Sequence, residues 1–249
     1  MRCVAVDAVR TAIVLAAGNG DRFINGTKDS KLLHPLLGQP LLLRTLVSAH
    51  DAGIDSAIVV LGYQADRVRQ LVERGAPSSL AISFAYNPEW RLENGLSVLA
   101  ARPLADDQRF ALLMGDHVFE PAVLRRLLRV TAGPDDSFLA VDSRRASPQV
   151  EAEATKVRRN GSRIVAIGKS LLDYDALDTG LFVCSPTLFG ALERARASGD
   201  TTVSGGIREL ARRRLMHAFE IGDATWCDID TVSDLAAAES VLNVTHEPA

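Results

Sequence analysis

The chain has 249 residues, enough for one large domain or two small ones; 47% are hydrophobic and 24% charged, which indicates a globular protein with a substantial core. The formal net charge of -3 leaves no basic surplus, so we expect no nucleic-acid partner. No apolar run approaches the ~20 residues that a membrane-spanning helix needs, and charges interrupt the first residues too closely for a signal peptide. We therefore expect no membrane segment.

The three cysteines, Cys3, Cys184 and Cys227, lie far apart, and no CxxC pair suggests a zinc site. Their odd number also argues against a disulfide framework. Reduced thiols of this kind are typical of cytoplasmic proteins, so we expect a cytoplasmic location.

Apolar runs typical of strands alternate with amphipathic runs typical of helices. The predicted strands are 11–17, 56–62, 81–86, 109–115, 137–142, 163–168 and 180–186. The predicted helices are 40–53, 64–75, 95–104, 120–133, 187–198 and 231–242. Thr231 and Asp234 form a capping pair at the start of the last helix. This alternation predicts an α/β protein with right-handed βαβ units and a mostly parallel sheet.

The polar stretch "SRRASPQVEAEATK" at 143–156 interrupts the alternation of strands and helices. No internal repeat or low-complexity linker divides the chain. We therefore expect a single domain over 1–249, with a lobe at about 142–185.

The stretch "LAAGNGDRF" at 15–23 follows the first predicted strand and contains Gly18 and Gly20. Glycines let the backbone approach a ligand closely, and free N–H groups in such a loop bind anions. Arg22 adds donors suited to phosphate oxygens. Phe23 stands where a dinucleotide fingerprint needs its third glycine, and the Gly-Lys-Ser/Thr of a P-loop is missing. The loop alone is equally consistent with an ordinary strand-to-helix turn.

Charged residues stand at the ends of several predicted strands, where ligands bind in open α/β sheets. Asp116 follows one strand, and Asp228 and Asp230 alternate with apolar residues, so that both carboxylates face one side of a strand. Two such carboxylates could hold Mg²⁺, although a helix cap and a polar sheet face explain them as well. Lys169 and Lys156 are surface lysines if considered singly. Together with the glycine loop, these residues favour nucleotide phosphate chemistry with a metal.

"LAAGNGDR" at 15–22, with Lys31 after it, resembles the signature of the nucleotidyltransferases that make activated sugars and alcohols from nucleoside triphosphates. Six further motifs, in order, resemble one branch, the CTP:inositol-1-phosphate cytidylyltransferases. They are "NGLS" (94–97), "MGDHV" (114–118), "EATKV" (153–157), "IGKSL" (167–171), "DTGLFV" (178–183) and "WCDIDT" (226–231). The resemblance implies a Rossmann-like nucleotidyltransferase fold, with a mixed, mostly parallel central sheet flanked by helices, and an acceptor-binding role for the lobe at 142–185.

The resemblance also implies roles for single residues. The nucleotide would contact Leu15, Ala16, Ala17, Gly18, Gly20, Asn94, Gly95 and Ser97. Arg22 would grip the leaving pyrophosphate, Lys31 would bind near the α-phosphate, and Lys169 would neutralise the acceptor phosphate. Mg²⁺ would be held by Asp116 and Asp230, with Asp228 beside them. The acceptor pocket would be shaped by Lys156, Asp178, Thr179 and Gly180.

Two positions leave a choice. The loop "INGTKDSK" is longer than in the family, so either Lys28 or Lys31 could be the catalytic lysine. We favour Lys31, because the residues after it keep the family's strand–turn–helix pattern. His117 lies beside the expected metal ligand, and we expect it to order the site rather than transfer a proton.

The function implied is transfer of CMP from CTP to inositol 1-phosphate, giving CDP-inositol and pyrophosphate. The acceptor phosphate would attack the α-phosphorus in line, with no covalent intermediate. Phosphocholine, a phosphonate or a sugar 1-phosphate are alternative acceptors, and the choice between CTP and UTP is open. A non-catalytic nucleotide sensor and a Rossmann oxidoreductase are disfavoured. A homodimer, and a separate membrane alcohol phosphotransferase as partner, are further expectations.

Overall fold

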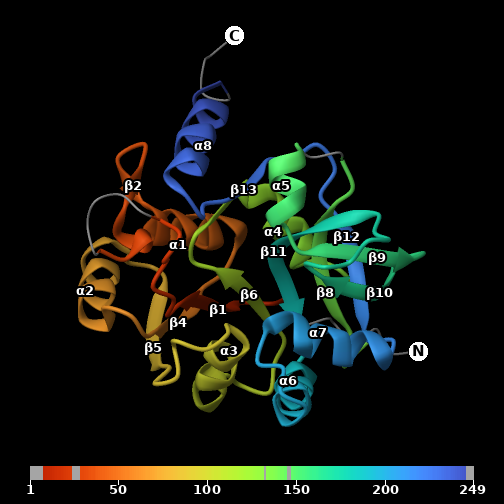
Figure 1. Ribbon diagram of the computed structural model, residues 1–249. Helices are drawn as coiled ribbons and strands as arrows, with labels where there is room; N and C mark the ends of the chain where they lie inside the picture. The colour runs from red at the N-terminus through yellow and green to blue at the C-terminus, as the bar shows by residue number, and fades with distance from the viewer. Residues whose placement is uncertain (1–7, 24–28, 132, 145–146, 245–249) are drawn as a thin grey trace.

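The computed structural model describes residues 8–23, 29–131, 133–144 and 147–244 (Figure 1). Nine strands form one sheet. In spatial order they are β5 (Ala81–Tyr86), β4 (Ser56–Leu61), β1 (Thr11–Ala16), β6 (Phe110–Met114), β11 (Ala176–Cys184), β8 (Ser137–Asp142), β12 (Met216–Glu220), β10 (Arg163–Gly168) and β9 (Lys156–Asn160). β11 and β10 are antiparallel to their neighbours, and the other strands all run in one direction. The predicted mixed, mostly parallel sheet is confirmed.

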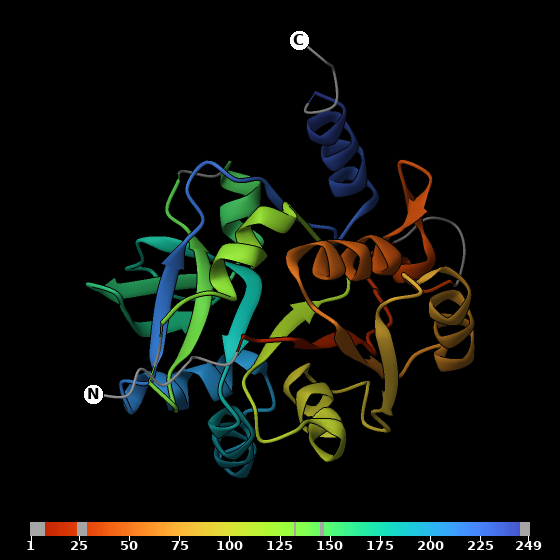
Figure 2. The same cartoon turned by 180° about the vertical axis from the view of Figure 1, so that it is seen from behind.

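Helices cover both faces of this sheet, as Figures 1 and 2 show. On one face lie α1 (Leu41–Ala52), α2 (Ala65–Gly75) and α4 (Pro121–Leu127). On the other face lie α3 (Gly95–Ala101), α6 (Thr187–Ala197) and α7 (Val203–Arg212). β1 has apolar side chains on both faces of the sheet. Val14 packs in the core beneath α1, α2 and α4, whereas Ile13 and Leu15 pack in the core beneath α3, α6 and α7. Successive side chains of a strand point to opposite faces, so an apolar strand such as "AIVLAA" is buried twice.

Shorter elements complete the fold. They are the 3-10 turns Lys31–Leu33 and Arg102–Leu104, α5 (Pro148–Glu153), α8 (Val232–Val244), and two small sheets that pair β2 (Pro35–Leu36) with β3 (Gln39–Pro40) and β7 (His117–Phe119) with β13 (Trp226–Asp228). α8 projects from the body in both views (Figures 1 and 2). Its start carries the predicted capping pair: Thr231 N–H donates to Asp234 Oδ2 at 2.7 Å, and Asp234 N–H donates to Thr231 Oγ1 at 3.2 Å.

Each predicted run contains the expected strand or helix, but the helix predicted over 120–133 ends at Leu127. α7 was not predicted from the sequence, because adjacent glycines such as Gly205 and Gly206 are unfavourable inside a helix. These glycines instead allow close packing: a Cβ at Gly206 would lie 2.6 Å from Leu192, and one at Gly205 would lie 2.6 Å from Asp200. β9, β12, α5 and β7 were also missed as elements. The strand expected to carry Asp228 and Asp230 is present as β13, but it ends at Asp228.

Among the described residues, no helix has the length and apolar character needed to cross a membrane. Cys184 and Cys227 are free thiols, as expected, and Cys3 lies outside the described residues. Burial raises the pKa of both described thiols. The division of the chain into one domain with a lobe at 142–185 stays a prediction.

Candidate active site

Two adjoining cavities open at the carboxyl ends of β1 and β6. The first, of about 1400 Å³, is bounded by the glycine loop, by residues 90–94 and by the start of α7. The second, of about 750 Å³, is bounded by α5, β11 and β13. Both cavities share a wall made of Arg22, Asn94, Asp116, Thr155, Lys169, Ser204 and Asp230. Five of the predicted site residues, Arg22, Asn94, Asp116, Lys169 and Asp230, therefore lie where the two cavities meet.

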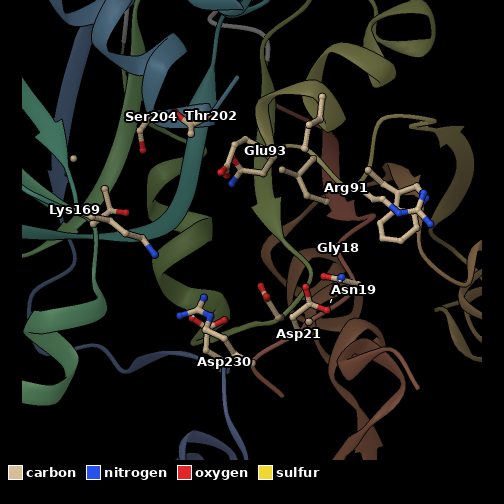
Figure 3. A pocket seen from close by; sticks show the side chains of 18 of the residues that line it. Gly18, Asn19, Asp21, Arg91, Glu93, Lys169, Thr202, Ser204 and Asp230 are labelled. Carbon is tan, nitrogen blue, oxygen red and sulfur yellow. Dashed lines mark hydrogen bonds and ion pairs between the residues drawn. The ribbon is translucent and has the colours of Figure 1, made fainter. Parts of the chain in front are cut away.

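The glycine loop lies on one side of the first cavity. Across the cavity from Gly18, Asn19 and Asp21, Figure 3 shows Lys169, Thr202 and Ser204. Leu15 C=O accepts a hydrogen bond from Gly115 N–H at 3.0 Å, and Ala17 C=O accepts one from Tyr63 N–H at 2.9 Å. Leu15 lines the cavity, whereas Ala16 and Ala17 are buried behind it. These backbone bonds fix the point from which the loop starts.

Gly20 is the glycine that the loop requires. It has a φ of 66°, and a Cβ there would lie 2.9 Å from Cγ of Lys31. Both the left-handed backbone and the passage of the lysine stem exclude a larger side chain.

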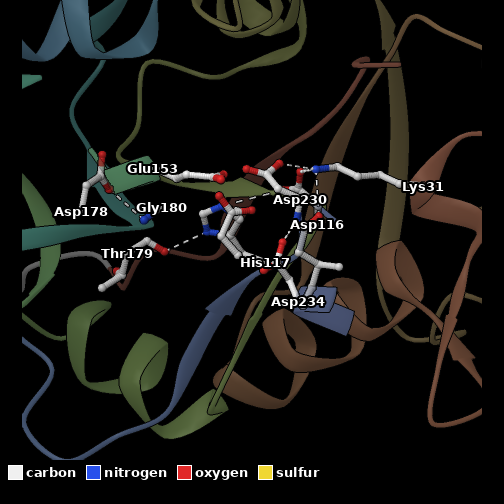
Figure 4. Close-up of polar contacts among 12 residues, drawn as sticks. Lys31, Asp116, His117, Glu153, Asp178, Thr179, Gly180, Asp230 and Asp234 are labelled. Atoms are coloured by element: carbon white, nitrogen blue, oxygen red, sulfur yellow. Dashed lines mark hydrogen bonds and ion pairs between the residues drawn. The ribbon is translucent and has the colours of Figure 1, made fainter. Parts of the chain in front are cut away.

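Lys31 lies at the centre of the site, only 8% exposed. Its ammonium is 2.7 Å from Oδ2 of Asp116 and 2.8 Å from Oδ1 of Asp230, and it donates to Ile229 C=O at 2.9 Å (Figure 4). Burial alone would lower the pKa of Lys31, but the charges of Asp116 and Asp230 outweigh it and raise that pKa above its ordinary value. The lysine is therefore a permanent cation held between two carboxylates. Lys28 lies outside the described residues.

Arg22 reaches from the glycine loop towards two carboxylates. One guanidinium nitrogen lies 2.5 Å from Oδ2 of Asp230, and the other lies 3.0 Å from Oε2 of Glu153 on α5. About half of its side chain is exposed. The guanidinium therefore remains accessible to an anion in either cavity.

His117 is held between β11 and β13. Its Nδ1 lies 2.9 Å from Thr179 C=O, and its Nε2 lies 3.3 Å from Oδ1 of Asp228 (Figure 4). Burial would lower the pKa of His117, but Asp228 and the more distant Asp116 raise it to about 10. Gly180, with a φ of 73°, makes room for the ring, since a Cβ there would lie 2.3 Å from it. These contacts suit a residue that orders the site.

The 94–97 segment contributes less of the cavity wall than expected. Asn94 lines both cavities, and its Oδ1 accepts a hydrogen bond from Val203 N–H at 2.9 Å. Gly95 N–H donates to Thr201 C=O at 2.9 Å, and a Cβ at Gly95 would lie 2.5 Å from that oxygen. Ser97 is buried and bonds Asn87. Gly95 and Ser97 therefore join α3 to its surroundings, and of these three residues Asn94 alone lines the two cavities.

Among the expected acceptor residues, Asp178 and Gly180 line the second cavity. Burial raises the pKa of Asp178 to about 6, although Gly180 N–H donates to its Oδ1 at 2.8 Å. Thr179 is buried, with its hydroxyl on Ala140 C=O, and it acts on the site through His117. Lys156 points its ammonium at Lys169 C=O, 2.9 Å away. Neither Thr179 nor Lys156 is among the described residues that line the two cavities.

Several cavity residues were missed from the sequence. Trp226 lines the second cavity, and its Nε1–H donates to Oδ2 of Asp142 at 2.8 Å. Arg144 also binds Asp142 and holds the pKa of that carboxyl below its usual range, against the effect of burial. Trp226 lies in the "WCDIDT" motif, which is the signal that could have identified it. Ser204 and Arg208 lie on α7, a helix that was not predicted from the sequence.

The expected metal ligands lie together. β13 ends at Asp228, so Asp230 lies beyond the strand, but both carboxylates line the second cavity. Asp116, His117 and Asp228 place ligand atoms within 4.8 Å of one another, and Asp116 and Asp230 share the ammonium of Lys31. Mg²⁺ prefers oxygen ligands, so the carboxylates of Asp116 and Asp230 could hold this ion.

The chain is similar in sequence and fold to several known proteins. The bifunctional IPC transferase and DIPP synthase of Rubrobacter xylanophilus is 38% identical over 93% of this chain, and that of Aquifex aeolicus is 31% identical over 94%. The chain spans about half the length of these relatives, 51% and 52%. The inositol-1-phosphate CTP transferase of T. maritima matches with a TM-score of 0.82 and 25% identity, over 97% of this chain and 98% of that one. A UDP-glucose pyrophosphorylase at 16% identity shares the fold, with a TM-score of 0.76.

The family model that matches this chain is the MobA-like NTP transferase domain, over residues 12–217. That range contains the glycine loop, Lys31, Asp116 and Lys169, and thus most of the shared cavity wall. The chain belongs to the MobA-like NTP transferase family, and it is a nucleotidyltransferase.

Proposed function

We propose that the chain transfers CMP from CTP to inositol 1-phosphate, releasing CDP-inositol and pyrophosphate. The observation that carries this proposal is the cluster of Lys31, Asp116 and Asp230 at the wall shared by two cavities. A phosphate transfer between two substrates needs charge compensation at the point where they meet. The names of the relatives support the choice of CTP and inositol phosphate.

CTP would occupy the first cavity and the acceptor the second. Arg22, half exposed, would bind the departing pyrophosphate, and Lys31 would bind near the α-phosphate. Lys169, which lines both cavities, would neutralise the acceptor phosphate. Because that phosphate is already ionised near neutral pH, its oxygen attacks the α-phosphorus with no general base, and the bond to pyrophosphate breaks. The protein's contribution is positioning and charge compensation.

Asp116 and Asp230 would hold Mg²⁺, with Asp228 beside them. The two carboxylates fit the ion because their oxygens already share one cation, the ammonium of Lys31. When bound, Mg²⁺ supplies positive charge to the α-phosphate.

The second cavity suits a polyol. Its wall carries the carboxylates of Asp142, Glu153, Asp178 and Asp228 and the ring of Trp226. Carboxylates accept hydrogen bonds from hydroxyl groups, and an aromatic ring packs against the C–H face of a carbocycle. We assign the acceptor-binding lobe to residues 142–185, which supply part of this wall.

The reaction would take place in the cytoplasm, where Cys184 and Cys227 stay reduced. A membrane alcohol phosphotransferase would use the product, because the relatives join an IPC transferase to a DIPP synthase. The enzyme would act as a homodimer.

A pyrophosphate-release panel tests the function. CTP and UTP are each combined with inositol 1-phosphate, phosphocholine, glucose 1-phosphate or a phosphonate, with and without Mg²⁺. We expect the fastest Mg²⁺-dependent release with CTP and inositol 1-phosphate. Equal or faster turnover with phosphocholine or glucose 1-phosphate would contradict the inositol assignment but leave the family intact.

A further inference from the structure

The loop that carries Lys169 is held from two sides by cations. Arg208 of α7 donates from Nη1 to Ile167 C=O at 2.9 Å, and Lys156 of β9 donates from Nζ to Lys169 C=O at 2.9 Å. Inside the loop, Leu171 N–H donates to Gly168 C=O at 3.3 Å. The backbone on which Lys169 stands is therefore fixed at both ends of a tight turn.

Arg208 is itself fixed by a second contact. Its Nη2 forms an ion pair with Asp200, whose Oδ1 accepts hydrogen bonds from Thr202 N–H at 3.0 Å and Thr202 Oγ1 at 2.7 Å. Thr202 is also the N-cap of α7, since its Oγ1 accepts from Gly205 N–H at 2.9 Å. The guanidinium thus joins the first turn of α7 to the end of β10.

The start of α7 is also anchored to the 94–95 segment at the beginning of α3. Val203 N–H donates to Oδ1 of Asn94, and Gly95 N–H donates to Thr201 C=O, both at 2.9 Å. α7 is therefore a fixed support between Asn94, which lines the cavity where we place the nucleotide, and the Lys169 loop, where we place the acceptor phosphate.

We propose that Arg208 is a positioning residue that acts through Lys169 to fix the acceptor phosphate. This inference rests on the proposed function. Asp200 balances the charge of Arg208, so the phosphate itself is assigned to Lys169. A lysine side chain carries about 2 kcal/mol of rotamer entropy, so fixing its backbone limits the positions that its ammonium can take. The guanidinium contacts the Ile167 carbonyl through Nη1 and the Asp200 carboxylate through Nη2, so one planar group holds both.

Arg208→Met tests this role, with Arg212→Met as the matched control. Arg212 lies one turn further along α7, is 70% exposed and pairs only with Glu209 among the described residues. We expect Arg208→Met to raise the acceptor KM about tenfold, within the loss that a small misplacement of a reacting group produces. Arg208 also lines the first cavity, but the KM for CTP should stay within about twofold, because the bonds that Asn94 and Gly95 make to the start of α7 do not involve the Arg208 side chain. Arg208→Lys should recover part of the loss, and Arg212→Met should change neither KM.

A double-mutant cycle separates positioning from a general structural effect. In the Lys169→Ala background, Arg208→Met should have no further effect on the acceptor KM. An additive effect, or an equal rise in both KM values, would overturn the proposal.

Hydrogen exchange gives a readout that needs no turnover. The amides of 168–172 should exchange faster in Arg208→Met than in Arg212→Met, because the carbonyl tether is lost. Unchanged exchange would overturn the proposal even if the variant were less active. If the wild type prefers another phosphorylated acceptor, the inositol assignment fails. The Arg208 proposal is then tested by running the same double-mutant cycle with that acceptor. If no acceptor is consumed, the exchange comparison alone decides on Arg208.

Discussion

The ammonium of Lys31 lies 2.8 Å from Oδ1 of Asp230, a residue 199 positions later in the chain. The same ammonium lies 2.7 Å from Asp116, so one cation joins the start, the middle and the end of the chain. The catalytic assignment depends on this contact, since it brings both expected metal ligands and the lysine to one point.

Lys31→Ala should lower kcat by about a hundredfold or more, which is the scale of losing one donor that stabilises charge in the transition state. Lys28→Ala is the comparison, and we expect it to change only the KM for CTP, and modestly. Lys31 is buried and held by two carboxylates, so it loses little entropy when it meets the transition state. Steady-state kinetics of both variants decides which lysine is catalytic. A large loss of kcat in Lys28→Ala and a small effect in Lys31→Ala would contradict the assignment.

Asp116→Asn and Asp230→Asn should each remove most activity while the fold is retained. Each change leaves Lys31 one charged partner, so circular dichroism and the thermal midpoint should change little. Asp173→Asn is the control, because that carboxylate is 80% exposed and pairs with Arg158 on the surface. Near-normal rates for both active-site variants at saturating Mg²⁺ would refute the metal assignment.

Gly180→Ala should destabilise the protein more than Gly161→Ala does. Both glycines have positive φ, 73° and 61°, which costs about 1–2 kcal/mol for a residue with a Cβ. A Cβ at Gly161 meets no heavy atom within 4 Å, whereas one at Gly180 would lie 2.3 Å from the ring of His117. We expect the overpacking to cost about 1–3 kcal/mol beyond the backbone term. Urea unfolding measures both variants, and equal losses would show that His117 yields without cost.

Asp178 should make stability depend on pH between its unfolded and folded pKa values. Burial raises its pKa to about 6, from about 4 in the unfolded chain, so the native state keeps a proton that the unfolded state has lost. The free energy of unfolding therefore falls as pH rises from about 4 to about 6 because of this group.

The variant Asp178→Asn cannot ionise and should escape this loss. Its stability relative to the wild type should improve from about pH 4 to about pH 7, as measured by urea midpoints in the presence of a chelator. Other titrating groups cancel in the comparison of the two proteins. A stability difference that stays constant across this range would show that Asp178 ionises normally in the folded protein.

The fold was readable where the hydrophobic pattern is strong. Buried strands such as β1 and β4 are continuous apolar runs, and α2 shows a clear apolar stripe, so periodicity was sufficient. β9 was missed because only Val157 of its residues is buried, and α7 because Gly205 and Gly206 resemble a break. The two glycines of α7 pack closely against Leu192 and Asp200. A prediction from a short stretch of sequence does not include such tertiary contacts.

The sequence predicted which residues form the site but not the contacts that their side chains make. The motifs brought out Arg22, Lys31, Asp116 and Asp230, which the structure places on or beside the shared wall. They also suggested ligand-binding roles for Lys156 and Ser97, which stay predictions. In the structure the Lys156 ammonium donates to Lys169 C=O, and the Ser97 hydroxyl accepts from Asn87. Neighbouring side chains of one motif point in different directions, and the sequence alone does not show which of them points into a cavity.

The most direct test of the proposed activity is the identity of the product. The purified chain is incubated with CTP, Mg²⁺ and inositol 1-phosphate, and the mixture is followed by ³¹P NMR and mass spectrometry. We predict that inositol 1-phosphate and CTP disappear together, that free pyrophosphate accumulates, and that a pair of coupled phosphorus resonances with the mass of CDP-inositol grows at the same rate. Formation of CMP with unchanged inositol 1-phosphate, or no reaction with CTP while another nucleotide is consumed, would contradict the account.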